Sequence, residues 1–126
     1  MILGIGVDLV LVGRMNEALG RHGRRFAERL LTVEELREFD AHPQAARFLA
    51  KRFAVKEAFA KALGMGMRSP LRWSWVGTLH DALGAPRLHF HPELATWLQS
   101  RGVTQTHVSI TDEQQQAMAF VILEGA

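Results

Sequence analysis

Apolar side chains recur along this chain with two different periods, and the period separates helices from strands. Spacings of three and four residues predict helices, whereas alternation predicts half-buried strands. The helical spacing is found at 13–19, 24–31, 33–40, 44–63 and 92–101. Extended patterns are found at 2–10, 73–79, 87–91, 106–111 and 116–124. Together they predict a single α+β domain over residues 1–126, with an antiparallel sheet packed against one long helix plus shorter helices.

Local signals set the boundaries of these elements. Thr32 and Glu35 match a capping box, which predicts a helix beginning at residue 33. Gly64 is expected to close the longest helix in the left-handed conformation. A turn with Gly and Pro at 83–86 and a polar turn at 112–115 predict two hairpins, and we expect the first strand to end near Asp8.

Composition narrows the class of protein. The chain has 126 residues, of which 48% are hydrophobic and 22% charged, which is typical of one globular domain rather than disorder. It contains no Cys, which excludes disulfides, Cys-zinc sites and thiol nucleophiles and fits a cytoplasmic location. The apolar start lacks a basic region, and no uncharged apolar stretch reaches the ~20 residues of a membrane span, so neither a signal peptide nor a membrane is expected.

The net charge of the chain is small, but positive charge is concentrated in one segment. The net charge is only +2, which gives weak support to nucleic-acid binding despite a pI of about 9.7. Residues 13–30 hold five arginines against two acids. The arginines are Arg14, Arg21, Arg24, Arg25 and Arg29. This segment is either a docking surface for an acidic partner or a solvated helix face.

Two carboxylates and one lysine are candidates for chemistry. Glu57 and Lys61 are four residues apart in the longest helix, so they share a face and are either a surface ion pair or part of a site. Asp8 follows an apolar strand, where it either caps the next helix or binds a cation. If Asp8 lies beside Glu57, the two carboxylates, phosphate oxygens and water form the oxygen-rich shell that Mg²⁺ prefers.

The segment 107–111 offers a third candidate. Alternation places His107, Ser109 and Thr111 on one side of a strand and two apolar residues on the other. This polar side either lines a pocket or is the wet face of an antiparallel sheet.

Three segments, 4–10 (GIGVDLV), 52–64 (RFAVKEAFAKALG) and 107–110 (HVSI), together resemble the holo-acyl-carrier-protein synthase family, the short trimeric branch of the phosphopantetheinyl transferases. The resemblance runs nearly end to end and implies the 4′-phosphopantetheinyl transferase fold. It implies Asp8 and Glu57 as Mg²⁺ ligands and catalytic residues, together with Lys61, which would contact the coenzyme A phosphates. The other coenzyme A contacts that it implies are Arg52, Gly64, Pro86 and His107.

The resemblance also implies the reaction and the partners. The 4′-phosphopantetheine group of coenzyme A would pass to a serine of apo-acyl carrier protein, with release of adenosine 3′,5′-bisphosphate, in support of fatty acid biosynthesis. Homotrimers with coenzyme A at the subunit boundaries are expected, so a monomer would be inactive. A metal-associated water, Asp8 or His107 could take the serine proton, and water is our prediction. Acyl carrier proteins are acidic, so Arg14, Arg21, Arg24 and Arg25 are the predicted docking residues.

The chain departs from the family pattern at several positions. Many relatives have a tyrosine where Gln116 stands and a histidine or a similar residue where Asp112 stands, and Trp73 and Trp75 are unusual. Two alternatives remain at this point: a small nucleic-acid-binding module that uses the arginines and tryptophans, and a Mg²⁺-dependent pyrophosphohydrolase that uses the same two carboxylates.

Overall fold

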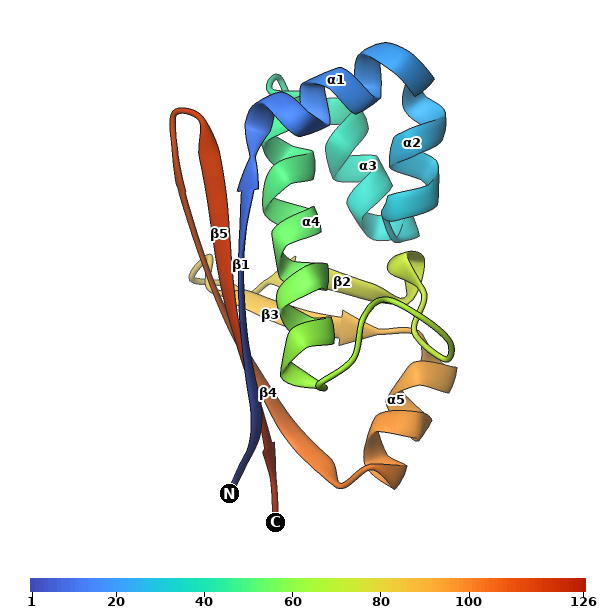
Figure 1. Ribbon diagram of the computed structural model, residues 1–126, viewed down its shortest axis with the longest axis vertical. Coiled ribbons are helices and arrows are strands. Elements are labelled where there is room, and N and C mark those ends of the chain that lie inside the picture. Colours follow the sequence, from blue (N-terminus) through green and yellow to red (C-terminus); the bar gives the residue numbers. More distant parts are fainter.

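A three-stranded antiparallel sheet and helix α4 (Ala45–Ala62) form the centre of the computed structural model, which describes residues 1–126 (Figure 1). The sheet has the strand order β1-β5-β4. Its strands are β1 (Ile2–Leu11), β4 (Val103–Glu113) and β5 (Gln116–Gly125). The inner face of the sheet packs on α4 through alternating apolar residues such as Val10, Val121 and Leu123, all of which are buried. The expected α+β architecture is confirmed.

Two glycines allow α4 to lie directly on β1. A Cβ atom on Gly4 would lie 1.9 Å from the carbonyl oxygen of Ala62, and one on Gly6 would lie 1.9 Å from that of Ala58. Any larger residue would therefore push the helix off the strand. This close approach brings Asp8, the next inward-facing residue of β1, to the side of α4.

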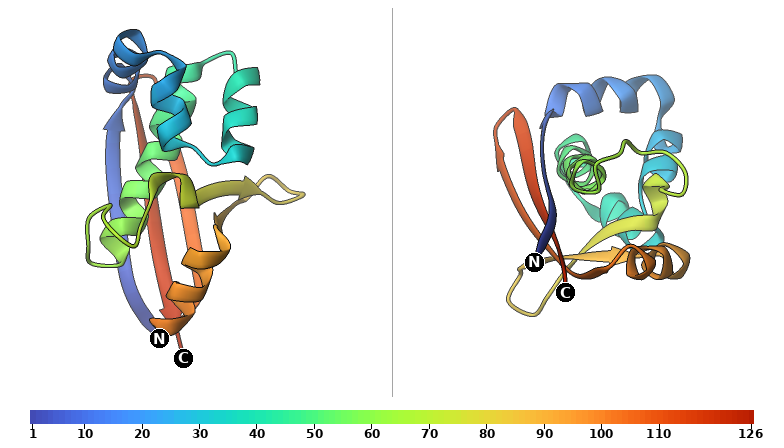
Figure 2. Two further views of the ribbon diagram at one scale, coloured as in Figure 1. Left: turned by 90° about the vertical axis from the view of Figure 1, so that its right-hand side faces the viewer. Right: turned by 60° about the horizontal axis from the view of Figure 1, so that its bottom comes forward.

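The remaining elements surround the other sides of α4 (Figure 2). Three helices pack at one end of it: α1 (Val12–His22), α2 (Arg24–Leu30) and α3 (Val33–Ala41). A second, two-stranded sheet is formed by β2 (Val76–His80) and β3 (Pro86–Phe90), whose connecting tip projects from the body of the molecule (Figure 2). Helix α5 (Pro92–Ser100) connects this hairpin to β4. None of the helices combines the length and the apolar composition needed to cross a bilayer.

The two predicted caps are confirmed. The backbone N–H of Glu35 donates to the Thr32 hydroxyl at 3.1 Å, and the Glu35 carboxylate accepts from the backbone N–H of Thr32 at 3.0 Å. Gly64, two residues beyond the end of α4, has a φ of 76°, the left-handed value predicted for it.

Four of the predicted elements have different boundaries in the structure. Strand β1 continues to Leu11, so Asp8 lies inside it, paired opposite Ala119, and does not cap α1. Helix α1 runs through Gly20, which is helical, and breaks only at Gly23 (φ 63°). The strand expected over 73–79 begins at Val76, because 73–75 form a 3₁₀ turn (η1). Strand β4 begins at Val103 rather than at residue 106, and it continues to Glu113, which shortens the predicted turn at 112–115.

Candidate active site

Asp8, Glu57 and Lys61 meet where β1 crosses α4. The Lys61 ammonium lies 3.0 Å from Asp8 Oδ1 and donates to the Val7 carbonyl oxygen at 3.0 Å. Lys61 therefore pairs with the strand carboxylate rather than with Glu57, its neighbour one turn away. The Asp8 side chain is 17% exposed and that of Lys61 is 54% exposed, so the ammonium sits at the open edge of the site.

Glu57 is the electrostatically perturbed member of this group. Burial raises the pKa of the Glu57 carboxyl above its usual value, and the negative charge of Asp8 raises it further. Lys61 and Arg14 oppose this shift. Two carboxylates thus lie close enough to repel one another, and a cation between them would relieve that repulsion. No cluster of three or more His, Cys, Asp or Glu side chains is arranged to hold a metal by itself.

Helical geometry separates Arg52 from this group. Residues 52 and 56 share one face of α4, and residues 57 and 61 share another, which is turned toward β1. The Arg52 side chain is only 4% exposed, lies over the Phe48 ring, and faces Glu35 and Glu38 of α3. Burial lowers its pKa. Within one chain, the structure therefore does not bring Arg52 to Lys61, and a contact of Arg52 with coenzyme A stays a prediction.

His107 lies on the opposite face of the sheet from Asp8. It pairs with Ile122 in the register, and its Nε2 lies 2.5 Å from Glu124 Oε1. The outward side chains of β4 are exposed, so the polar side predicted for this strand faces outward from α4. Within one chain, the sheet stands between His107 and the carboxylate pair.

Gly64 and Pro86, the other predicted coenzyme A contacts, lie beyond the end of α4 and at the start of β3. Nothing lies within 4 Å of a Cβ built on Gly64, so the backbone at the end of α4 is open to close approach. Pro86 begins β3 at the base of the projecting tip. Asp81 orders this tip by accepting hydrogen bonds from the backbone N–H groups of Leu83 and Ala85, at 2.9 and 3.0 Å.

Most of the predicted docking arginines surround one open concavity of about 620 Å³ between α1 and α2. Its lining residues include Arg14, Arg21, Arg25 and Arg29. Arg24 lies apart, because its guanidinium is held by Asp40 at 2.7 Å and by Glu28 at 3.1 Å. Arg29 replaces it in the concavity, and helical spacing from Arg25 is the signal that could have identified it.

An apolar outer sheet face is the feature that sequence reasoning missed. Large apolar side chains on the face of β1 and β5 that points away from α4 are 39–60% exposed. They are Ile5, Val7, Leu9, Leu11, Met118 and Phe120. The signal was present, since these β1 residues alternate with Gly4, Gly6 and Asp8, which face α4.

Asp112, one of the departures from the family pattern, has a structural role here. Its carboxylate lies 2.9 Å from the guanidinium of Arg47, which also donates to the backbone carbonyls of Glu113 and Gln114. Arg47 thus ties the β4–β5 turn to the start of α4. Gln116 is the first residue of β5 and is exposed.

Comparison with known proteins gives a consistent result. The family model described as "4'-phosphopantetheinyl transferase superfamily" matches residues 4–121. A holo-[acyl-carrier-protein] synthase of Nitrosospira multiformis is 55% identical over 124 residues, which cover 98% of this chain and 99% of that protein. The corresponding protein of Laribacter hongkongensis is 50% identical over 125 residues, covering 99% and 100% of the two chains.

Solved structures agree. The crystal structure of holo-[acyl-carrier-protein] synthase from Neisseria meningitidis superposes with a TM-score of 0.95 at 44% identity, over 98% of this chain and 99% of that one. A Bacillus anthracis holo-(acyl-carrier-protein) synthase, solved in complex with CoA (3',5'-ADP), has a TM-score of 0.82 at 30% identity, over 100% and 99% of the two chains.

Proposed function

Because this chain belongs to the 4′-phosphopantetheinyl transferase superfamily, as one of its holo-[acyl-carrier-protein] synthases, we propose that it performs its coenzyme A-dependent transfer to acyl carrier protein with Mg²⁺ held between Asp8 and Glu57. The carrier serine hydroxyl attacks the β-phosphate of coenzyme A, a new P–O bond forms to the serine, and the bond to adenosine 3′,5′-bisphosphate breaks. The observation that carries this proposal is the convergence of Asp8, Glu57 and Lys61 at the β1–α4 crossing.

The donor set fits magnesium. Mg²⁺ is usually held by one or two carboxylates, with water and substrate phosphates completing its shell. Asp8 and Glu57 supply two hard oxygen ligands from facing elements. The pKa of Glu57 is raised first by burial and then by the negative charge of Asp8, and a cation between the two carboxylates would offset this repulsion. When bound there, the ion would neutralise charge that develops on the pyrophosphate oxygens.

Lys61 supplies a second positive charge. Its ammonium is at the open edge of the site and is held only by Asp8 and one backbone carbonyl, so it is free to turn toward a phosphate oxygen. An ammonium fixed near oxygens that become more negative stabilises the transition state. Gly64, one turn beyond Lys61, leaves room for the substrate to approach the backbone.

The serine proton requires an acceptor within hydrogen-bond reach. The Asp8 carboxylate already accepts from Lys61, and His107 of the same chain lies across the sheet. Within one chain these placements leave water as the acceptor that we propose, and His107 would reach the serine only from another copy of the chain.

The basic concavity supports docking of the acidic carrier beside this site. Arg14 lines the concavity and also lies close enough to Glu57 to lower the pKa of that carboxyl. A carrier bound there would present its serine near the carboxylate pair. The docking set that we propose is Arg14, Arg21, Arg25 and Arg29, without Arg24.

The outer sheet face supports assembly into a trimer. Contiguous exposed apolar side chains on β1 and β5 mark a surface that another subunit would cover. His107 and Asp8 lie on opposite faces of one sheet, so a coenzyme A molecule that contacts both would lie between two copies of the chain. His107 and Pro86 would then come from one copy, with Asp8, Glu57 and Lys61 from the other. We place this enzyme in the cytoplasm, in service of fatty acid biosynthesis.

The proposal is tested by following both products. Protein, coenzyme A and Mg²⁺ are incubated with and without apo-acyl carrier protein, and adenosine 3′,5′-bisphosphate and the carrier mass are measured together. A transferase releases the nucleotide only when the carrier gains mass, whereas the pyrophosphohydrolase alternative consumes coenzyme A without any carrier. Transfer at an undiminished rate after metal removal by a chelator would contradict the metal role.

A further inference from the structure

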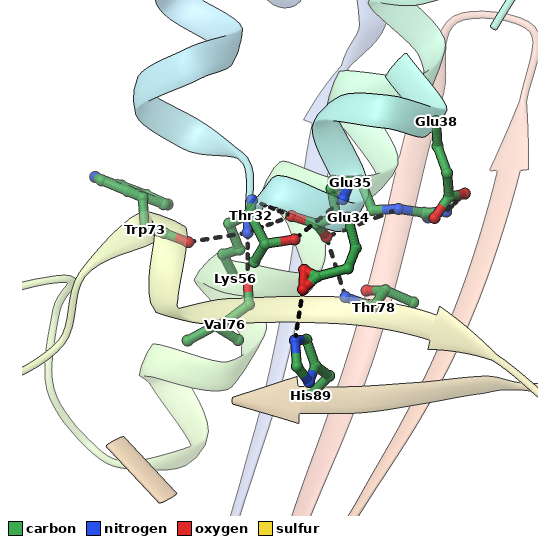
Figure 3. Close-up of polar contacts among 10 residues, drawn as sticks. Thr32, Glu34, Glu35, Glu38, Lys56, Trp73, Val76, Thr78 and His89 are labelled. Atoms are coloured by element: carbon green, nitrogen blue, oxygen red, sulfur yellow. Dashed lines mark hydrogen bonds and ion pairs between the residues drawn. The ribbon is translucent and has the colours of Figure 1, made fainter. Parts of the chain in front are cut away.

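Lys56, the residue before Glu57, is the most deeply buried charged group in the molecule. Its side chain is 0% exposed, and its ammonium has three acceptors (Figure 3). They are Glu35 Oε1 at 2.8 Å and the backbone carbonyl oxygens of Trp73, at 2.9 Å, and Val76. An ammonium has three N–H donors, so every donor of Lys56 is used inside the protein.

Its partner Glu35 is equally enclosed. The carboxylate is 1% exposed and also accepts from the backbone N–H groups of Thr32 and Thr78, both at 3.0 Å (Figure 3). The pair thus joins four segments: the start of α3, the middle of α4, the 3₁₀ turn η1 and strand β2. Their convergence on Lys56 holds α4 on the side that faces away from β1.

Such a pair is an inefficient way to stabilise a fold. Burial lowers the pKa of Lys56, because removal of an ammonium from water is costly, and the charge of Glu35 only offsets part of this. Replacement of a buried ion pair by apolar side chains of similar volume is often neutral or stabilising. What apolar packing does not supply is direction, since hydrogen bonds to three fixed acceptors define where Lys56 points.

The direction in which Lys56 points matters because the next residue is Glu57. Successive side chains of an α-helix are turned by about 100°, so the rotation of α4 that places Lys56 also places Glu57. On the opposite side, Gly4 and Gly6 let α4 approach β1 closely, and the side-chain hydrogen bonds across this contact come from Lys61, which is half exposed and belongs to the site itself. We propose that Lys56 and Glu35 are positioning residues, which fix the rotation of α4 so that Glu57 and Lys61 face Asp8.

This inference rests on the proposed metal role of Glu57. The double variant Lys56→Met with Glu35→Gln carries the test, because it removes both charges and leaves neither one buried alone. Lys56→Met is examined beside it but leaves Glu35 unpaired and can fail to fold. Leu94→Ala is the control, because Leu94 is a buried residue of α5 remote from the carboxylates.

Two quantities are measured on variants that unfold cooperatively. The first is the dissociation constant for Mn²⁺ without coenzyme A, which does not depend on turnover. We expect it to rise by about tenfold in the double variant. The second is kcat at saturating coenzyme A and carrier, which we expect to fall on the order of 10²-fold, because small misplacements of reacting groups have effects of that size. Leu94→Ala should keep both quantities within about twofold of the wild type, whatever it does to stability.

The outcomes separate the two proposals. A folded double variant that binds Mn²⁺ and turns over like the wild type, while the wild type shows metal-dependent transfer, overturns the positioning role alone. A wild-type protein whose transfer needs no metal overturns the proposed function, and the positioning role falls with it. Equal losses in the double variant and in Leu94→Ala would assign the pair to stability and also overturn the inference.

Discussion

The Lys61 ammonium lies 3.0 Å from Asp8 Oδ1, so the lysine occupies the carboxylate that we assign to the metal. A divalent ion that binds Asp8 must compete with this ammonium. Once displaced, the ammonium is available to the phosphates of coenzyme A. This relationship would couple binding of the proposed metal to the position of the Lys61 ammonium.

We therefore predict opposite effects of Lys61→Ala on metal binding and on turnover. Loss of the competing ammonium should tighten Mn²⁺ binding in the absence of coenzyme A, as measured by titration calorimetry. Loss of its charge from the transition state should lower kcat/KM by about 3 kcal/mol, or roughly 10²-fold, the scale seen when one preorganised donor is removed. Weaker Mn²⁺ binding by this variant would show that Lys61 does not compete for Asp8.

Because α4 and β1 are in close contact, we predict that one added methyl group at this contact strongly lowers the stability of the fold. In Gly6→Ala the new Cβ would lie 1.9 Å from the backbone oxygen of Ala58, so strand and helix must separate. We expect a loss of about 3 kcal/mol in the free energy of unfolding, measured with urea. Gly20→Ala is the matched control: it lies within α1 with nothing near its Cβ, and it should be stabilised by about 0.5–1 kcal/mol.

If the carrier docks in the basic concavity, neighbouring arginines should differ in their effect on carrier binding. Arg21→Ala with Arg25→Ala should raise the KM for the carrier by about tenfold and flatten its dependence on salt, because both guanidinium groups line the concavity. The KM for coenzyme A should not change. Arg24→Ala is the comparison, since its side chain is held by Asp40 and Glu28. An Arg24→Ala effect as large as that of the pair would return Arg24 to the docking surface.

Much of the fold could be predicted from local signals, and the missed parts depend on long-range contacts. The capping box at Thr32 and the left-handed Gly64 are set by a few neighbouring residues, so both predictions were confirmed. The end of β1 is set instead by its pairing with β5, which continues to Leu11 opposite Gln116. Trp73 and Trp75 alternate as a strand would. The 3₁₀ turn forms there instead, with Trp75 stacked between Arg72 and His91.

In the candidate site, too, some residues could be predicted from local signals and others depend on long-range packing. Asp8, Glu57 and Lys61 could be grouped by helical spacing and by resemblance, and the glycines at 4 and 6 explain why they meet. The burial of Arg52 could not be predicted, because it depends on how α3 packs against α4. The same packing encloses Lys56, which was not singled out from the sequence, and Glu35, which was predicted only as part of a capping box.

Assembly provides a further prediction. Phe120→Asp would place a charge on the apolar outer face of the sheet, where Phe120 is opposite Val7 and Ser109. We expect this variant to sediment as a folded monomer with little transfer activity, because the proposed site takes residues from two copies. Gln99→Asp, on the exposed side of α5, should sediment as the wild type does, which we propose to be a trimer. An active monomer would contradict the composite site.

The central claim is that Asp8 and Glu57 hold the metal on which transfer depends, and intact-mass measurement of the carrier tests it most directly. Apo-acyl carrier protein is incubated with coenzyme A and Mg²⁺, together with either the wild-type protein or Glu57→Gln. We predict that the carrier gains the mass of one phosphopantetheine group with the wild type, while folded Glu57→Gln gives almost none. Wild-type rates of mass gain with Glu57→Gln, or no gain with the wild type, would contradict the account.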